Sequence, residues 1–185
     1  LKKTNFRYKK IKSINQKIAE LLANGQVVAR VSGCMEFGPR ALGNRSILYR
    51  ATDNSVNSWL NKNLNRSEFM PFAPMTLIDD VEKYYLNIDG GRDAAKYMTM
   101  TFDCSKKMID EAPATVHIDK TARPQFISKK DYPDMYEILS EYKKLTGLSN
   151  IVNTSFNMHE EPIVSSEHDA IESFTKSGLK WMALG

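Results

Sequence analysis

Apolar residues recur at helical spacing between positions 11 and 22, and Asn24-Gly25 follows them as a typical helix stop. The apolar segment 26–31 comes next and is typical of a strand. The same reading along the chain predicts helices over 53–64, 79–86, 136–145 and 166–176, with strands over 97–102, 126–128 and 150–152. Helices and strands are mixed throughout. The predicted class is therefore α/β, with α+β as the alternative, built as a twisted mixed sheet flanked by helices.

Composition indicates one globular domain over residues 1–185, because 42% of the residues are hydrophobic and 26% are charged. No apolar run is long enough to cross a bilayer, and the first residues lack the apolar stretch of a signal peptide, so we expect a cytoplasmic protein. Cys34 and Cys104 have neither paired spacing nor a nearby histidine, and we expect both to be free thiols. The first residue is Leu1 instead of methionine, as expected for a fragment of a longer enzyme.

Positive charge is concentrated in one segment. The chain carries a net charge of +4, and residues 37–66 contain five basic residues against a single acidic one. The whole excess therefore lies there, since the remaining charges cancel. A diffuse basic surface is typical of nucleic-acid binding, whereas a local one interrupted by Gly and Asn favours a pocket for a small polyanion. Charge count alone favours the plainer alternative, a solvated positive face.

Residues 36–46, Glu-Phe-Gly-Pro-Arg-Ala-Leu-Gly-Asn-Arg-Ser, follow neither a helical nor a strand pattern. The two glycines allow turns that other residues resist, and Pro39 fixes one backbone dihedral. Such a loop can hold the guanidinium groups of Arg40 and Arg45 in place. Because a fixed guanidinium binds phosphate or carboxylate through two parallel hydrogen bonds, the segment is predicted to bind an anion.

Three further polar clusters lie at the ends of apolar segments. The paired prolines of 69–74 preset an extended backbone, so we interpret this cluster as structural. In 117–125 an imidazole, a carboxylate, a hydroxyl, a guanidinium and an amide occur close together. Residues 153–157 follow a predicted strand, where α/β sheets commonly present ligand-binding loops. Each cluster alone is weak evidence, because a single His117 is more often structural and Asn-Thr-Ser is a common turn.

Taken in order, these stretches resemble one family. Residues 36–47, 71–74, 117–125 and 153–157, the last followed by 161–164, are similar to the C-terminal domain of the O-carbamoyltransferases that modify Nod factors, cephamycins and aminoglycosides. The resemblance runs from about residue 20 to the end, and four ordered motifs are far more specific than one. It implies a YrdC-like fold that makes carbamoyl-adenylate from ATP and carbamoyl phosphate. It also implies a partner in the full-length chain, an actin-like N-terminal domain that transfers the carbamoyl group to an acceptor hydroxyl.

The resemblance, together with the need to bring two anions together and neutralise developing charge, assigns roles to particular residues. Arg40 and Arg123 are expected to bind the phosphates, and Ser155 is the third expected catalytic residue, contacting the adenylate or triphosphate. ATP is the expected nucleotide, with Mg²⁺ held through phosphate oxygens and water and with no metal site of the protein's own. The other residues expected to bind substrate or nucleotide are Asn44, Arg45, Arg66, His117, Thr121 and Asn153.

The chain also departs from the family pattern. Cys34 stands where many relatives carry arginine, and Leu64 and Met70 stand where relatives carry basic residues. Lys62 and Arg66 are the candidates to compensate. If the replaced positions are essential, the domain binds nucleotide without turnover and acts as a degenerate interaction domain that supports the transferase. An RNA-binding module is a third hypothesis, ranked lower because the sequence has no basic stripe interleaved with aromatic residues.

Overall fold

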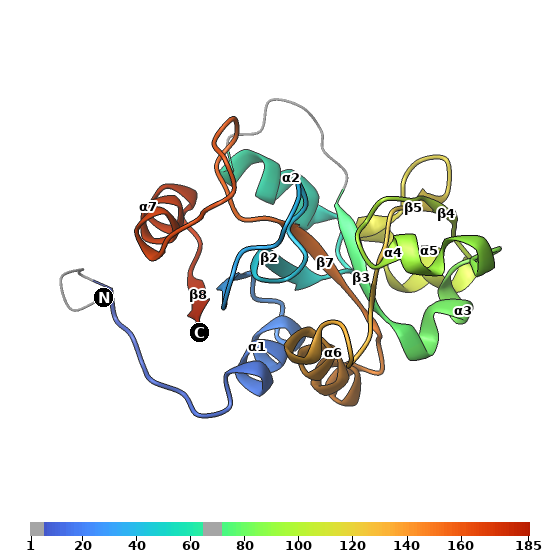
Figure 1. Ribbon diagram of the computed structural model, residues 1–185, viewed down its shortest axis with the longest axis horizontal. Coiled ribbons are helices and arrows are strands. Elements are labelled where there is room, and N and C mark those ends of the chain that lie inside the picture. The colour runs from blue at the N-terminus through green and yellow to red at the C-terminus, as the bar shows by residue number, and fades with distance from the viewer. Residues whose placement is uncertain (1–5, 65–71) are drawn as a thin grey trace.

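A six-stranded mixed sheet forms the centre of the computed structural model, which describes residues 6–64 and 72–185 (Figure 1). The strand order is β6-β3-β7-β2-β1-β8. β1 pairs with β8 and β3 with β6 in parallel, whereas the pairs β1/β2, β2/β7 and β3/β7 are antiparallel. The strands are β1 (Val28–Val31), β2 (Arg45–Arg50), β3 (Ala73–Leu77), β6 (Gln125–Ile127), β7 (Asn150–Ser155) and β8 (Trp181–Leu184).

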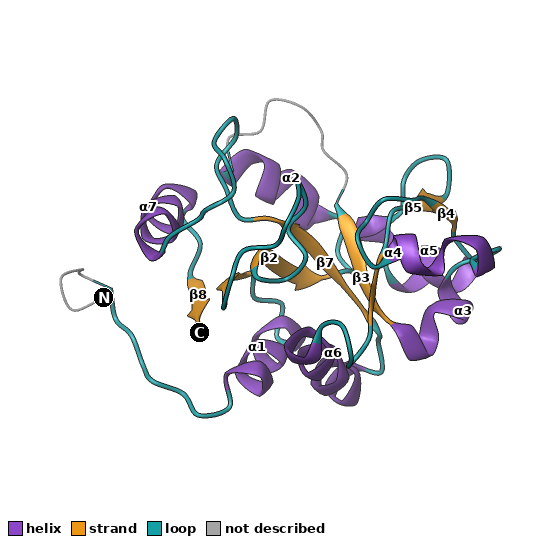
Figure 2. Ribbon diagram, in the orientation of Figure 1, coloured by secondary structure: helices purple, strands orange, loops and turns teal. Residues whose placement is uncertain are grey.

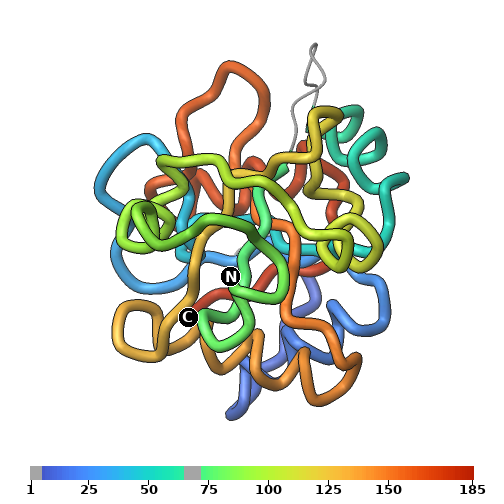
Figure 3. Tube along the Cα trace, turned by 90° about the vertical axis from the view of Figure 1, so that its right-hand side faces the viewer, coloured from blue at the N-terminus to red at the C-terminus, as the bar shows by residue number. Residues whose placement is uncertain are grey.

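Helices cover both faces of this sheet (Figure 2). α1 (Ile14–Ala23) and α6 (Pro133–Thr146) pack side by side on one face, and both lie below the sheet in Figures 1 and 3. α2 (Ser55–Asn63) and α7 (Glu167–Ser177) lie on the other face. The predicted mixed sheet flanked by helices is confirmed.

Short elements extend the second layer between β3 and β6. They are the 3₁₀ turns Ile78–Asp80, Asp89–Gly91 and Pro113–Thr115, the helices α3 (Val81–Tyr84), α4 (Arg92–Ala95) and α5 (Lys106–Glu111), and the small strand pair β4 (Phe102–Asp103) and β5 (Thr121–Ala122).

Each face of the sheet has its own apolar core, because alternate residues of a strand point to opposite faces. In β2, Leu48 belongs to the cluster under α1 and α6, whereas Ile47 and Tyr49 belong to the cluster under α2 and α7. All six residues of this strand are buried or nearly so. Because β2 is buried on both faces, its sequence shows no strict alternation of apolar and polar residues.

Local sequence explains where the two longest helices begin and end. α6 has a proline at its first turn and ends at Gly147, whose φ of 79° suits the left-handed cap. α7 begins with a capping box in which the Ser166 side chain accepts from the Asp169 amide and the Asp169 carboxylate accepts from the Ser166 amide. The predicted helices over 136–145 and 166–176 are therefore confirmed, with α6 starting three residues earlier than expected at Pro133.

The predicted strand over 97–102 is wrong, because only Phe102 belongs to a strand. Met98 adopts a left-handed turn with a φ of 55° and packs against Leu42 and Ala73. Tyr97 is 55% exposed, so the apolar residues of this segment do not form a buried strand. Strands β2, β3 and β8 were not predicted from the sequence.

Cys34 is exposed and Cys104 is buried, and neither forms a disulfide, as predicted. No helix within the described ranges has the length and apolar character needed to span a membrane.

Candidate anion-binding site

One edge of the sheet collects most of the residues predicted to bind a ligand. β7 runs antiparallel to β2 and β3, and β6 runs parallel to β3, so the end of β7 meets the starts of β2, β3 and β6. Ser155 pairs with Ser46 at this edge, and Asn153 pairs with Ala73. The segment 32–44, which we call the arginine loop, joins β1 to β2 at the same edge.

Glu36 organises the arginine loop through its carboxylate. One oxygen, Oε1, accepts hydrogen bonds from the backbone amides of Leu42 at 2.6 Å, Asn44 at 2.6 Å and Arg45 at 3.3 Å. A carboxylate that accepts several backbone N–H groups makes strong, charge-assisted hydrogen bonds. These bonds join position 36 to positions 42–45, and Arg40 lies in the part of the loop that they enclose.

Arg30 of β1 holds the C-terminal end of the arginine loop. Its buried guanidinium donates to the Gly43 carbonyl at 2.7 Å and to Asn44 Oδ1 at 3.2 Å, and pairs with Asp134 of α6 at 3.0 Å. Burial lowers the pKa of Arg30, and the carboxylates of Asp134 and Glu36 oppose that shift. Asn44 also donates to the Cys34 carbonyl at 2.9 Å. The side chain of Asn44, a predicted binding residue, therefore holds the base of the loop.

Asn153 and Gln125 support the arginine loop from the sheet. Asn153 Nδ2 donates to the Ala41 carbonyl at 2.8 Å and to Gln125 Oε1 at 3.3 Å. Gln125 Nε2 donates to the Leu42 carbonyl at 2.9 Å. Both side chains are buried, and they connect the strands β7 and β6 to two consecutive carbonyls of the loop.

Arg45 is buried at the start of β2, and its guanidinium donates hydrogen bonds to backbone carbonyls. Nη1 donates to Ser32 and to Asn44, and Nη2 donates to Gly33, each at 2.9 Å. These bonds connect both ends of the arginine loop. The structure therefore gives Arg45 a positioning geometry, while its predicted contact with nucleotide stays a prediction.

Arg40 and Arg123 are two positively charged residues of this edge. Arg40 is exposed in the arginine loop, and Arg123 is half-buried between β5 and β6. Burial lowers the pKa of Arg123, and the charge of Arg40 lowers it further. Neither guanidinium forms an ion pair with an acid in the part of the chain that the structure describes. A guanidinium group is suited to binding phosphate or carboxylate through two parallel hydrogen bonds, so the predicted role of these two residues in binding an anion stays a prediction.

His117 and Thr121 close a tight turn that leads into β5, whose first residue is Thr121. The His117 amide donates to the Thr121 carbonyl at 2.8 Å, and the Thr121 hydroxyl donates to Asp119 at 2.8 Å. Asp119 also accepts from the Thr121 amide at 3.0 Å, and it forms no ion pair with Arg123.

Ser155 is half-buried at the last position of β7, and the next amide, Phe156, donates to the Arg45 carbonyl at 2.9 Å. The predicted residue Arg66 lies outside the described residues. Within the described ranges, no group of three or more His, Cys, Asp or Glu residues is placed to hold a metal ion.

Sequence reasoning missed three residues that hold this edge together. Glu36 and Gln125 lay inside the quoted motifs without a role, and Arg30 lay in a predicted strand. A charged residue in the middle of an apolar strand is a usable signal, because buried arginine is rare unless it is paired. A carboxylate at the start of a Gly- and Pro-rich loop is a second signal, since such loops leave backbone amides without partners.

Comparison with known proteins identifies the family to which the chain belongs. Residues 19–185 match the family model described as "Carbamoyltransferase C-terminus". Nodulation protein NolO of Bradyrhizobium diazoefficiens is 38% identical over 90% of this chain and 30% of its own length. Nodulation protein U of Sinorhizobium fredii is 40% identical over 84% of this chain and 27% of its own length. The chain thus spans about a quarter to a third of the curated relatives it matches.

Solved structures show the same fold at low sequence identity. Full-length HypF in a phosphate- and nucleotide-bound form superposes with a TM-score of 0.66, at 19% identity, over 92% of this chain and 24% of that one. Sua5 of P. abyssi in complex with L-threonine gives a TM-score of 0.65, at 11% identity, over 95% and 48%. The fold is YrdC-like, as the resemblance implied. The matched family model and these relatives show that the chain belongs to the family of carbamoyltransferase C-terminal domains.

Proposed function

We propose that this domain binds ATP and carbamoyl phosphate and forms carbamoyl-adenylate. The observation that carries the proposal is the pair Arg40 and Arg123, two neighbouring cations at the edge of the sheet that pair with no acid among the described residues. Both substrates are polyanions, and their reaction requires that mutual repulsion be overcome. Fixed guanidinium groups provide that neutralisation without reorganising during the reaction.

The proposed reaction has two steps. Water cleaves carbamoyl phosphate to carbamate and inorganic phosphate. A carbamate oxygen then attacks the α-phosphorus of ATP, forming the new P–O bond as the bond to the bridging oxygen breaks and pyrophosphate leaves. No covalent protein nucleophile takes part, so the protein contributes orientation and charge.

We assign Arg40 and Arg123 to the phosphate groups and Ser155 to a hydrogen bond with the adenylate or triphosphate. We assign Asn44, Asn153 and Arg45 to positioning, because their side chains hold the arginine loop. His117, Thr121 and Arg66 remain assigned to substrate or nucleotide binding. Mg²⁺ is proposed to accompany ATP and to be held by phosphate oxygens and water, in keeping with the donor set of this edge.

Full-length HypF, which has a similar fold, is known in a phosphate- and nucleotide-bound form, and this supports our proposal of a nucleotide site. NolO and nodulation protein U extend well beyond the matched region. We propose that transfer of the carbamoyl group to an acceptor hydroxyl belongs to that remaining, larger part of the relatives.

The test is pyrophosphate release by the purified domain. With ATP, Mg²⁺ and carbamoyl phosphate, the domain should release pyrophosphate, and it should release none when acetyl phosphate replaces carbamoyl phosphate. ATP binding measured by calorimetry without pyrophosphate release would instead establish the degenerate, non-catalytic domain. Absence of ATP binding would overturn both functions.

A further inference from the structure

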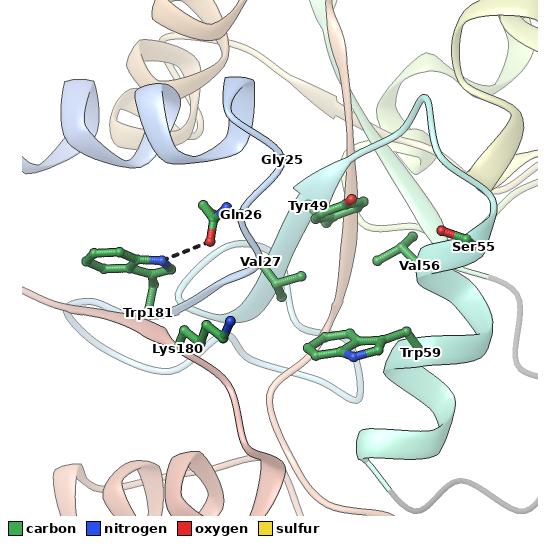
Figure 4. Close-up of a pocket in the computed structure, with 9 residues that line it drawn as sticks. All are labelled: Gly25, Gln26, Val27, Tyr49, Ser55, Val56, Trp59, Lys180 and Trp181. Atoms are coloured by element: carbon green, nitrogen blue, oxygen red, sulfur yellow. Dashed lines mark hydrogen bonds between the residues drawn. The ribbon is translucent and has the colours of Figure 1, made fainter.

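A cavity of about 360 Å³ opens at the opposite end of the central strands from the arginine loop (Figure 4). Gln26 and Val27 precede β1, Tyr49 is near the end of β2, and Trp181 begins β8. The arginine loop, by contrast, follows the end of β1 and leads into β2. No residue assigned above to the phosphates lines this cavity, so any ligand here is separate from the proposed reaction.

Both tryptophans of the chain line this one cavity. Trp59 of α2 is 42% exposed and Trp181 is 44% exposed, whereas tryptophan is on average a highly buried residue. The Trp181 indole N–H donates to Gln26 Oε1 at 3.1 Å, which fixes the ring (Figure 4). Val27 lies between the two indoles in that view. The cavity therefore presents a fixed aromatic and aliphatic surface to solvent.

The charge at this cavity is positive. Lys180 is exposed, lines the cavity and forms no ion pair within the part of the chain that the structure describes. The acid of the adjoining β2–α2 turn, Asp53, accepts hydrogen bonds from Tyr49 and Ser55 and pairs with Arg50 at 3.5 Å. Its charge is therefore already balanced by Arg50, and the Lys180 ammonium is left for a ligand.

We propose that this cavity binds a small planar aromatic anion, with the ring against the indoles of Trp59 and Trp181 and the carboxylate or phosphate at Lys180. The volume lies within the range of small-molecule sites. Aromatic rings pack favourably against indoles, and a charged contact to an ammonium is stronger than a neutral one. An aromatic cage for a cation is disfavoured here, because the Lys180 ammonium repels positive charge.

Intrinsic fluorescence tests the proposal directly, because every tryptophan of the chain lines the cavity. Benzoate and phenyl phosphate are the probes, benzyl alcohol is the neutral analogue, and tryptophan emission is the signal. We expect a saturable change with both anions and an affinity for benzyl alcohol lower by about 10-fold, equivalent to about 1.4 kcal/mol. The variants Trp59→Phe and Trp181→Phe should each keep a saturable response from the remaining indole.

Lysine variants provide the charge test. Lys180→Glu should lower the affinity for both anions by about 10-fold or more. Lys129→Glu, an exposed lysine that does not line the cavity, is the matched control and should leave the affinity unchanged. Absence of saturation at millimolar probe, equal affinity for benzyl alcohol, or equal losses in the two lysine variants would overturn the proposal. Arg40→Ala should bind both probes normally, so failure of the proposed carbamoyl-adenylate chemistry would leave this result untouched.

Discussion

The charge of Arg40 lowers the pKa of Arg123, although the two side chains come from different loops at the edge of the sheet. Burial is the larger cause of that shift, and no acid of the described chain pairs with either guanidinium. An arginine that is half-buried beside a like charge costs folding free energy. A phosphate bound between the two would relieve that repulsion, so this arrangement favours ligand binding over stability.

The first prediction concerns Arg40→Lys. The variant should lose pyrophosphate release by about 10²-fold or more, because an ammonium cannot reproduce a bidentate guanidinium contact. Its free energy of unfolding should change by less than about 0.5 kcal/mol, since Arg40 is exposed and has no ion pair to lose within the described residues. Coupled-assay kinetics and urea unfolding measure the two quantities.

Arg92→Lys is the control for this prediction, because Arg92 forms surface ion pairs with Glu82 and Asp89 away from the arginine loop. It should leave pyrophosphate release unchanged. A fall of activity and stability together in Arg40→Lys would mean that Arg40 is structural, and the assignment to phosphate would be wrong.

The second prediction concerns Glu36, whose single oxygen accepts three backbone amides. Glu36→Ala leaves those amides without a partner and should destabilise the fold by about 1–3 kcal/mol. Glu36→Gln retains an acceptor oxygen and should keep more than half of that stability. Both variants should weaken ATP binding measured by calorimetry, because the loop that holds Arg40 loosens. Equal unfolding free energies for the two variants would show that the carboxylate geometry is irrelevant.

Helices and strands could be predicted from the sequence where their own residues carry capping or periodic patterns. α7 was predicted because Ser166 supplies a cap and apolar residues follow at helical spacing. β3 was not predicted, because a proline such as Pro74 is unusual in a strand inside a sheet. The structure tolerates this proline because it pairs with Val152 of β7 one position before pairing with β6 begins at Met75.

The order of the motifs predicted which segments lie at the candidate site, but it did not predict what each side chain contacts there. Asn153 and Ala41 are separated by 112 residues and yet share a hydrogen bond at 2.8 Å. No local pattern reports such a contact, because it depends on how β7 and the arginine loop meet in the fold. Asn153 was therefore expected to contact the nucleotide, whereas its Nδ2 atom supports the loop.

The third prediction is a pH dependence of stability at Asp80. This buried carboxylate accepts hydrogen bonds from Lys83, Lys143 and Ser149. Burial raises the pKa of Asp80, but the bonds from Lys143, Lys83 and Ser149 outweigh burial and hold the pKa well below its ordinary value of 3.8. The carboxyl is then more acidic in the folded than in the unfolded state. Its stabilisation is complete above the unfolded-state pKa and is lost as the pH falls through the folded-state pKa.

Urea unfolding from pH 6 downward measures this effect. The wild type should lose stability below about pH 4, while Asp80→Asn should start less stable and show a shallower decline. Asp110→Asn is the control, because Asp110 forms an exposed pair with Lys106 that is worth little. Parallel curves for the wild type and Asp80→Asn would remove Asp80 from the acid transition.

The last prediction tests whether Arg123 and Ser155 act on one ligand. Both lie at the edge of the sheet near the arginine loop, Arg123 before β6 and Ser155 at the end of β7. If both contact the same phosphate or adenylate, the double alanine variant should lose less activity than the product of the two single losses, because residues that act as a unit are not additive.

Pyrophosphate release by the wild type, both single variants and the double variant measures this coupling. Arg123→Ala combined with Ser105→Ala is the matched control, since the Ser105 side chain caps α5 and should affect stability alone. That control pair should be additive in the free energy of activation. If Arg123→Ala and Ser155→Ala each change activity little and combine additively, neither residue belongs to the reaction site, and the phosphate would have to be held by other groups of the arginine loop.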